Sequence, residues 1–338
     1  MRTSPRQWSH KVAGKLRLAA RFLAPDSGEP IVLMYHGVIA DAGHTAGVGD
    51  HKHVGESLFR KQLELLAAHR RVVALSTLIE GLLGGGDCRG IVAITFDDGY
   101  LNNAECAARV LQEYSMSATF FLATGFIGVQ RWAWTDRIEF VVATAEEQEA
   151  SIRLSDRAEG THGGISRVRL GPRHERGALL ARLKAELKDL DWRVAEERVR
   201  ELASILGVCD AAPHGQYRFM TWDHARALVK SGFEVGAHTV NHAILSRVPL
   251  STAEEEILGS RDRIRVETGK CCPTFCYPNG RATDFTRGVM EICSRYFDAA
   301  LSAIPGTARR EDRFELRRLG VDQGTPVERL AARLLEGI

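Results

Sequence analysis

Residues 91–99 read Ile-Val-Ala-Ile-Thr-Phe-Asp-Asp-Gly, and this stretch decides the fold class. Its first four residues are apolar and mostly β-branched, and the run has the length of a buried strand. Asp97 and Asp98 should therefore emerge at the carboxyl end of that strand, just before a glycine turn. Because active sites of parallel α/β proteins lie at this end of the strands, both carboxylates are candidate catalytic residues.

A second stretch repeats this arrangement. Residues 233–237 predict another strand, and His238 and His242 follow it in the segment His-Thr-Val-Asn-His. One carboxylate and two imidazoles form a typical hydrolytic zinc set, which leaves the other carboxylate available as a general base. Asp-Asp-Gly alone is common in solvated turns, and a lone His-x-x-x-His often occurs by chance. Their joint occurrence after two strand-like runs favours a catalytic metal site.

In these two motifs the chain resembles the NodB-homology polysaccharide deacetylases, carbohydrate esterase family four. The hallmarks of that family are Thr-Phe-Asp-Asp-Gly and a later His-Ser/Thr-x-x-His. The similarity continues in residues 117–121, 220–223 and 231–236, and it spans residues 30–130 and 217–320. It implies an α/β fold, namely a distorted (β/α) barrel of the polysaccharide deacetylase type.

The resemblance also implies roles for the motif residues. Asp97 would be the general base, and Asp98, His238 and His242 would bind a divalent metal ion, with Zn²⁺ as the expected ion. The implied partner is an N-acetylated saccharide substrate.

The third motif of the family is usually Arg-Pro-Pro-Tyr-Gly, and residues 276–280 here read Cys-Tyr-Pro-Asn-Gly. In the family, the backbone N–H at the tyrosine position helps to hold the tetrahedral oxyanion. A backbone donor does not depend on the side chain, so Asn279 is the expected donor.

Cys276 stands where the family carries an arginine that orients the catalytic base. Arg317 and Arg318, which follow a strand-like run at residues 314–316, are candidate replacements. Three residues beside the family motifs are expected to contact the substrate: Tyr100, Tyr277 and Pro278.

The general acid is expected at the other end of the chain. Family members generally carry a late histidine that protonates the leaving amine, yet no histidine follows His242. His36 comes just after the first strand-like run, residues 31–33. The chain resembles in this a subgroup involved in exopolysaccharide synthesis, in which the histidine-bearing strand has moved to the N-terminus. A closed barrel permits such a permutation because its first and last strands are neighbours. His36 is the candidate acid, and the alternative is a buried histidine bonded to backbone groups.

The length of the chain indicates an insertion. A minimal barrel needs about 250 residues, whereas this chain has 338. We expect the insertion at residues 131–216, between barrel segments 26–130 and 217–338.

The insertion is expected to be helical, with a second helix running from an Asp191 N-cap to Gly207. The predicted apolar faces consist of Leu179, Leu180, Leu183 and Leu187 in the first helix and of Val194, Val199, Leu202 and Leu206 in the second. Trp132 and Trp134 either stack on a sugar ring or pack in the core.

Composition agrees with an ordinary globular enzyme, since 44% of the residues are hydrophobic and 26% are charged. The net charge of +2, without a concentrated basic domain, argues against a nucleic-acid partner. The seven cysteines are odd in number and include no Cys-x-x-Cys, so we expect reduced thiols and a cytoplasmic location.

Residues 1–25 predict a basic amphipathic helix. They contain six Arg or Lys residues and no acidic residue, and apolar side chains recur at near-helical spacing. This helix either makes peripheral contact with the inner membrane surface or packs on the barrel with its charges in solvent. Neither a transmembrane run nor a secretory signal is expected.

The sequence therefore predicts a metal-dependent hydrolase that removes N-acetyl groups from a sugar in a polysaccharide or its precursor and releases acetate. Two alternatives stay open. One is a related deacylase acting on a formamido sugar or an O-acetyl group, and the other is a non-catalytic carbohydrate-binding module.

Overall fold

A parallel β-sheet forms the centre of the molecule. The computed structural model describes residues 28–41, 52–146, 149–153, 165–209 and 211–337. Within them, eight strands form one sheet in the order β11-β10-β9-β6-β5-β1-β12, with β4 beside β5, and their pairings are parallel. The strands are β1 (Ile31–Tyr35), β4 (Arg71–Val73), β5 (Ile91–Phe96), β6 (Thr119–Leu122), β9 (Glu234–Ala237), β10 (Thr274–Cys276), β11 (Ala299–Leu301) and β12 (Leu319–Gly320).

The last strand segment joins the two edges of this sheet. Leu319 of β12 pairs with Leu33 of β1, and Leu316 forms a parallel bridge with Leu301 of β11. The sheet therefore curls into a distorted barrel, which confirms the predicted fold class. The strand predicted at residues 314–316 is wrong in position, because only Leu316 pairs and the strand itself lies at β12.

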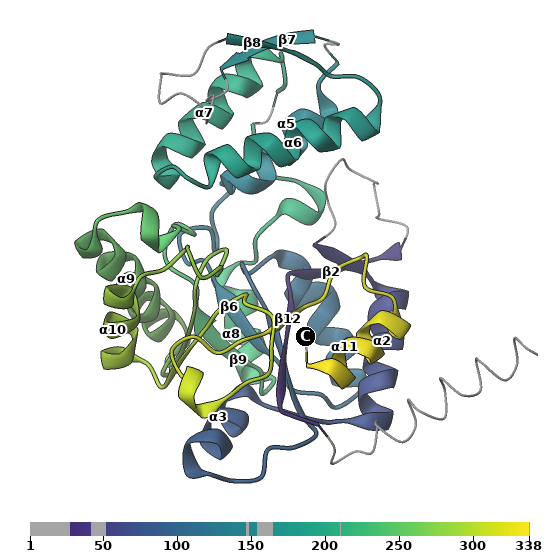
Figure 1. Ribbon diagram of the computed structural model, residues 1–338, viewed down its shortest axis with the longest axis vertical. Coiled ribbons are helices and arrows are strands. Elements are labelled where there is room, and N and C mark those ends of the chain that lie inside the picture. The colour runs from purple at the N-terminus through teal and green to yellow at the C-terminus, as the bar shows by residue number, and fades with distance from the viewer. Residues whose placement is uncertain (1–27, 42–51, 147–148, 154–164, 210, 338) are drawn as a thin grey trace, which may run out of the picture.

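Helices surround the barrel, as Figure 1 shows. They are α2 (Glu56–His69), α3 (Leu75–Gly84), α4 (Ala108–Glu113), α8 (Trp222–Lys230), α9 (Leu250–Thr268), α10 (Arg287–Tyr296) and α11 (Val327–Glu336). A π-helical turn, η2 (Asn103–Ala107), precedes α4, and a short pair of strands, β2 (Gly37–Ile39) and β3 (His53–Gly55), follows β1. Local signals explain several helix ends: the side chain of Thr221 accepts a hydrogen bond from the His224 N–H in a capping box, and α9 ends at Gly269 with φ +69°.

The barrel core consists mainly of aliphatic and aromatic side chains. All six residues of β5 are buried, as expected for a strand covered on both faces. Stacked rings cross the sheet, with 5.3 Å between the centroids of Tyr35 and Phe96 and 5.1 Å between those of Phe96 and Phe120. This packing fixes the strands whose carboxyl ends carry the predicted site.

Residues 134–206 form a second hydrophobic core next to the barrel. Its elements are α5 (Trp134–Thr144), the antiparallel hairpin of β7 (Glu149–Arg153) and β8 (Ile165–Arg169), α6 (Arg173–Leu187) and α7 (Trp192–Ile205). Figure 1 shows these helices grouped at one end of the barrel, above the sheet. The insertion thus contains the predicted helices and, in addition, a hairpin that the sequence pattern did not indicate.

The helix patterns in the insertion are largely reproduced. The four leucines predicted on the face of α6 are buried, and Asp191 caps α7 by accepting a hydrogen bond from the Arg193 N–H. Gly207 follows α7 with φ +62°. The prediction for Val194 is wrong, because its side chain is 42% exposed and Ala195 takes the buried position instead.

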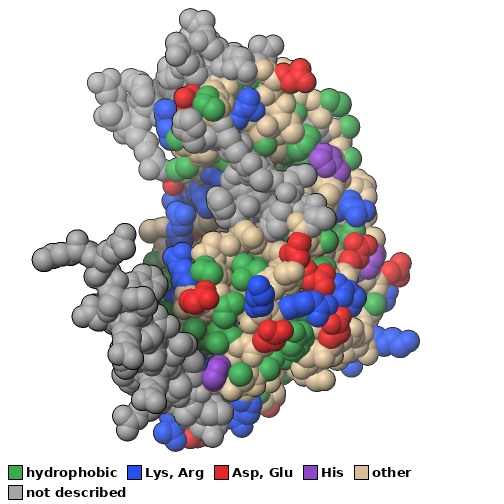
Figure 2. Space-filling view, turned by 90° about the vertical axis from the view of Figure 1, so that its right-hand side faces the viewer, with side chains coloured by type: hydrophobic (Ala, Val, Ile, Leu, Met, Phe, Trp, Pro, Cys, Tyr) green, Lys and Arg blue, Asp and Glu red, His purple; other side chains and the backbone are tan. Residues whose placement is uncertain are grey.

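Charged side chains of both signs lie close together on the face in Figure 2, in agreement with the low net charge. The seven cysteines, all within the described residues, are free thiols. Among the described helices, none has the length and hydropathy needed to cross a membrane. The predicted amphipathic helix at residues 1–25 lies outside the described residues.

Replacing Leu33 by alanine tests the central position of β1. Leu33 is fully buried, so its truncation should lower the free energy of unfolding by about 2–5 kcal/mol in urea titrations. Leu250, which is 52% exposed on α9, is the matched control, and Leu250→Ala should change this free energy by about 0.5 kcal/mol or less. Equal losses in the two variants would contradict the assignment of β1 to the barrel core.

Candidate active site

Asp97 and Asp98 follow β5 at the rim of the barrel. The Asp97 N–H donates to the Tyr35 carbonyl at 2.9 Å, which continues the pairing of β5 with β1 for one residue. The chain then turns through left-handed conformations at Asp98 (φ +73°) and Gly99 (φ +86°). A Cβ at position 99 would lie 2.8 Å from the Ile127 side chain, so the turn requires glycine. The turn directs consecutive carboxylates into the site.

The two histidines follow β9 on the same rim. The His238 N–H donates to the Leu122 carbonyl at 3.1 Å, and His242 has a left-handed backbone (φ +54°). Glu256 of α9 holds the intervening loop, because its buried carboxylate accepts hydrogen bonds from the Val240 and Asn241 N–H groups at 2.9 and 2.7 Å. The sequence analysis did not identify Glu256, which lies on a helix and carries no motif.

Asp98, His238 and His242 bring three ligand atoms together. The Nε2 atoms of His238 and His242 lie 3.4 and 3.2 Å from the same oxygen, Oδ1 of Asp98. That oxygen is buried and, among the described residues, accepts no hydrogen bond. A tetrahedral ion with ligands at about 2.0–2.1 Å separates its ligand atoms by about 3.3 Å, so the three residues fit a metal such as zinc.

Neighbouring groups prepare these ligands for a cation. The Nδ1 atom of His238 lies 2.7 Å from the Cys276 carbonyl, which holds the ring so that Nε2 faces Asp98. Burial by itself raises the pKa of Asp98, but His242 and His238 outweigh it and hold the pKa well below its usual value. Asp98 is therefore ionised, as a metal ligand must be.

Arg318 forms a buried, bidentate ion pair with Asp97. Its Nη1 and Nη2 atoms each lie 2.8 Å from one carboxylate oxygen, and the guanidinium also donates to the Ser302 carbonyl at 2.7 Å and to the Thr95 hydroxyl at 3.1 Å. Burial is the largest single cause and raises the pKa of Asp97, but the charge and hydrogen bonds of Arg318, together with the nearby histidines, outweigh it, and the pKa is lowered. Of the two candidate arginines, Arg318 is the one on Asp97, whereas the Arg317 side chain is 45% exposed and lies near Asp312.

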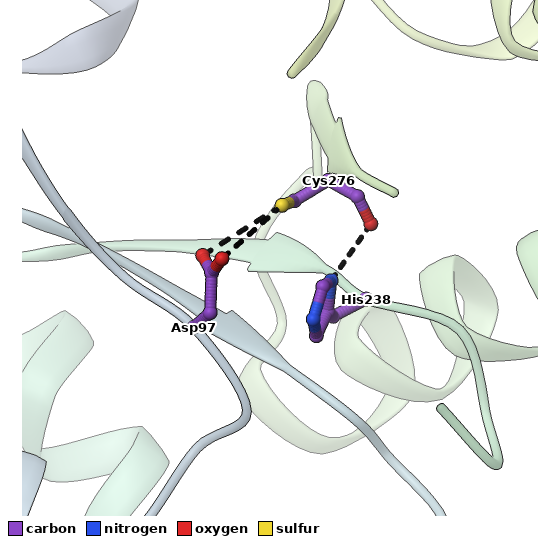
Figure 3. A group of neighbouring side chains, drawn as sticks. All are labelled: Asp97, His238 and Cys276. Carbon is purple, nitrogen blue, oxygen red and sulfur yellow. Dashed lines mark hydrogen bonds between the residues drawn. The ribbon is translucent and has the colours of Figure 1, made fainter. Parts of the chain in front are cut away.

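Asp97, His238 and Cys276 form a second group of neighbouring ligand atoms, drawn in Figure 3. The Cys276 sulfur lies 3.6 Å from both Asp97 oxygens, and the Cys276 carbonyl faces the His238 ring. Arg318 already occupies both Asp97 oxygens, and its Nη2 also lies 3.0 Å from the sulfur. Burial raises the pKa of the thiol, so this group is a packed arginine site rather than a second metal site.

His36 lies between β1 and β2 and lines the same cavity as Asp97, Asp98 and both histidine ligands. Among the described residues, its ring forms no hydrogen bond to a backbone group. Burial lowers the pKa of His36, although the carboxylates of Asp98 and Asp97 act in the opposite direction.

The segment after β10 also contributes to the cavity wall. Asn279 has a left-handed backbone (φ +59°), and its N–H has no hydrogen-bond partner among the described residues. Tyr277 also lines the cavity, but its hydroxyl donates to the Phe314 carbonyl at 2.8 Å. Pro278 is buried, and its carbonyl accepts from the Gly280 N–H at 2.6 Å.

The remaining predicted substrate contacts differ in position. Trp134, at the start of α5, lines the cavity. Trp132 is packed instead, with its ring stacked 5.1 Å from that of Phe140. The Tyr100 hydroxyl is buried and donates to Asp136 at 2.8 Å. Neither Trp132 nor Tyr100 belongs to the cavity wall as far as the described residues form it.

The cavity has a volume of about 350 Å³, within the range of small-molecule sites, and both the barrel and the insertion contribute to its wall. Three lysines that the sequence analysis did not identify belong to it: Lys52, Lys184 and Lys188. Lys184 lies in the last turn of α6 and Lys188 is the residue that caps this helix, still in a helical conformation, so the spacing of four places both side chains on one face.

Replacing Arg318 by methionine tests the buried ion pair. The variant leaves Asp97 as an uncompensated buried carboxylate, so the free energy of unfolding should fall by about 3–5 kcal/mol in urea titrations. Arg317→Met, which removes an adjacent exposed arginine, should cost about 1 kcal/mol or less. In an Asp97→Asn background the loss caused by Arg318→Met should shrink, and an unchanged loss would contradict the pairing.

Comparison with known proteins agrees with this geometry. Residues 85–154 and 195–294, together about half of the chain, match the family described as polysaccharide deacetylase. The matched segments include Asp97, Asp98, His238 and His242 but not His36 or Arg318. No curated protein matches the sequence.

Several solved deacetylase structures have a similar fold. The Streptococcus pyogenes deacetylase PplD in complex with acetate is 16% identical, with a TM-score of 0.58 and coverage of 91% of this chain and 99% of that one. IcaB from Ammonifex degensii is 16% identical, with a TM-score of 0.58 and coverage of 92% and 99%. The de-N-acetylase of Aggregatibacter actinomycetemcomitans is 16% identical, with a TM-score of 0.55 and coverage of 90% and 99%. From the family match, the chain belongs to the polysaccharide deacetylase family.

Proposed function

We propose that this protein is a metal-dependent hydrolase that removes N-acetyl groups from a sugar in a polysaccharide or its precursor and releases acetate. One observation carries the proposal: three convergent metal ligands and the Asp97–Arg318 pair share one cavity with His36. The family supplies the reaction class, and the cavity supplies the groups that this reaction needs.

Asp98, His238 and His242 would hold the ion, for which we propose Zn²⁺. When bound, the ion would polarise the acyl carbonyl and make water acidic enough to attack an amide at neutral pH. Asp97 would accept the proton of that water, because Arg318 keeps its carboxylate ionised and oriented.

The segment after β10 would stabilise the negative oxygen of the tetrahedral intermediate. The unpartnered N–H of Asn279 is a fixed dipole, held by a backbone conformation that few non-glycine residues adopt. His36 would donate a proton from its ring to the departing amine nitrogen. That role requires the protonated ring during turnover; burial lowers the pKa of His36, and the carboxylates of Asp98 and Asp97 oppose this lowering without cancelling it.

The proposal is tested by measuring acetate release from a panel of N-acetylated saccharides in free, lipid-linked and nucleotide-linked form. Acetate should appear with an equal amount of free amine, and chelation of the metal should abolish the reaction. Release of formate from a formamido sugar, or of acetate only from O-acetyl esters, would replace the proposed substrate by a related one. Saccharide binding without hydrolysis of any member would contradict an enzymatic function.

Two substitutions separate the ligand role from the base role. His238→Ala should abolish stoichiometric metal binding, measured by elemental analysis of the purified protein, because it removes one of three ligands. Asp97→Asn should retain the metal and lower kcat by about a hundredfold or more, the usual scale for a general base. Metal retained by His238→Ala, or lost from Asp97→Asn, would reverse these assignments.

A leaving-group comparison tests His36. His36→Ala should bind metal normally but lose most of its turnover on an N-acetyl sugar, because an amine departs only after it is protonated. Hydrolysis of an aryl acetate should fall much less, since a phenolate departs without a proton. Similar losses on both substrates would instead indicate a role in substrate binding or in folding.

A further inference from the structure

The cavity contains more cationic groups than the proposed reaction uses. Five cationic side chains line it: Lys52, Lys184, Lys188, Arg281 and Arg318. Three of them contact a buried carboxylate, in the pairs Arg318–Asp97, Lys52–Asp136 and Lys184–Glu139. Their charges are thus compensated within the protein.

The other two cations, Lys188 and Arg281, form no ion pair within the described part of the chain. The Lys188 Nζ donates to the Asn279 Oδ1 atom, a neutral acceptor, at 2.6 Å. The carboxylate of Asp284 is buried and accepts hydrogen bonds from the Arg281 backbone N–H at 2.8 Å and from the Asn279 side chain, not from either cationic group. Lys188 is half-buried and Arg281 is exposed, so together they form a cationic path from the cavity to solvent.

The environment of Lys188 disfavours its charge. The pKa of Lys188 is lowered to about 8: burial is the largest cause, the charges of Arg281 and Lys184 act in the same direction, and Asp284 opposes them. A bound anion would remove this penalty, because an opposite charge favours the ionised form.

We propose that Lys188 and Arg281 bind a phosphoryl group carried by the N-acyl saccharide, so that the substrate is a sugar phosphate rather than a neutral glycan. This inference rests on the proposed deacylase activity. An ammonium and a guanidinium suit a phosphoryl group, which offers several acceptor oxygens and up to two negative charges near neutral pH.

Asn279 relates the phosphoryl subsite to the reacting amide. Its backbone N–H is the proposed donor to the tetrahedral oxygen, and its side chain holds Lys188. Both proposed subsites therefore adjoin one residue, which suits acyl and phosphoryl groups on neighbouring positions of one sugar. An N-acetylhexosamine 1-phosphate has this arrangement, with the acylated nitrogen on C2 and the phosphoryl oxygen on C1.

The experiment compares two substrates that differ only in the group on the C1 oxygen: N-acetylglucosamine 1-phosphate, with a charged phosphoryl group, and the methyl glycoside of N-acetylglucosamine, with a neutral methyl group. For the metal-loaded protein, kcat/KM should be about tenfold or more higher for the phosphate, the scale of one charge-assisted hydrogen bond. Lys188→Met and Arg281→Gln should each remove most of this preference by raising KM for the phosphate, with kcat/KM for the methyl glycoside changed about threefold or less.

Arg182→Gln is the matched control, because it removes one exposed positive charge from the same helix, α6, without altering the cavity wall. It should keep the preference for the phosphate. Equal kcat/KM values for the two substrates in the unmodified protein, or a preference that survives both Lys188→Met and Arg281→Gln, would overturn the inference. Higher activity on an N-acetylated uronic acid than on the phosphate would also overturn it, because that substrate carries a carboxylate instead.

Two further arms identify the carrier and separate this inference from the proposed function. A nucleoside diphosphate sugar and a short-chain lipid diphosphate sugar both carry a phosphoryl group on C1. The one with the higher kcat/KM identifies the carrier of the natural substrate. Calorimetry with glucosamine 1-phosphate and glucosamine measures binding without turnover. Tighter binding of the phosphate that is lost in Lys188→Met, in a protein that releases no acetate, would overturn the deacylase activity but support the phosphoryl subsite.

Discussion

The closure of the barrel by residues 316–320 is the constraint on which the site depends. Leu316 pairs with one edge of the sheet and Leu319 with the other, so the residues between them must face the barrel interior or the solvent in alternation. Arg318 lies inside, where it meets Asp97. Taking both charges out of water is unfavourable, but the bidentate contact and the bonds to Ser302 and Thr95 compensate for it. The same five residues thus close the fold and keep Asp97, the proposed general base, ionised.

In this architecture, the position of a strand in the barrel matters more than its order in the chain. The matched family segments cover neither end of the barrel, yet β1 at the beginning and β12 at the end are neighbours. His36 and Arg318 therefore line the same cavity, although they are almost three hundred positions apart in the sequence. A parallel barrel tolerates such exchanges because each side chain at the rim is placed by its own strand.

Strands and motifs could be predicted from the sequence where the neighbouring residues alone determine the local structure. The apolar run at residues 91–96 fits a strand that is buried on both faces of a parallel sheet, and the residues that follow this strand must reach the rim of the barrel. The choice between Arg317 and Arg318 could not be predicted, because it depends on the register of a two-residue strand and reverses with a shift of one residue. Glu256 and Lys188 were missed for a related reason: Glu256 lies on a helix and Lys188 caps one, neither belongs to a motif, and only the folded structure shows that they lie beside the candidate site.

The insertion has a hydrophobic core of its own, and it reaches the chemistry through only a few side chains on α5 and α6. The cavity wall is thereby encoded in two parts of one gene: the proposed catalytic groups lie in the barrel, and the proposed phosphoryl subsite combines Lys188 of the insertion with Arg281 of the barrel. Under the proposed function, mutations in the insertion would alter part of the cavity wall while the barrel and its candidate metal ligands remain unchanged. Divergence among proteins with this barrel would then accumulate in the insertion first, and exchange of the whole segment between relatives offers a route to new substrates.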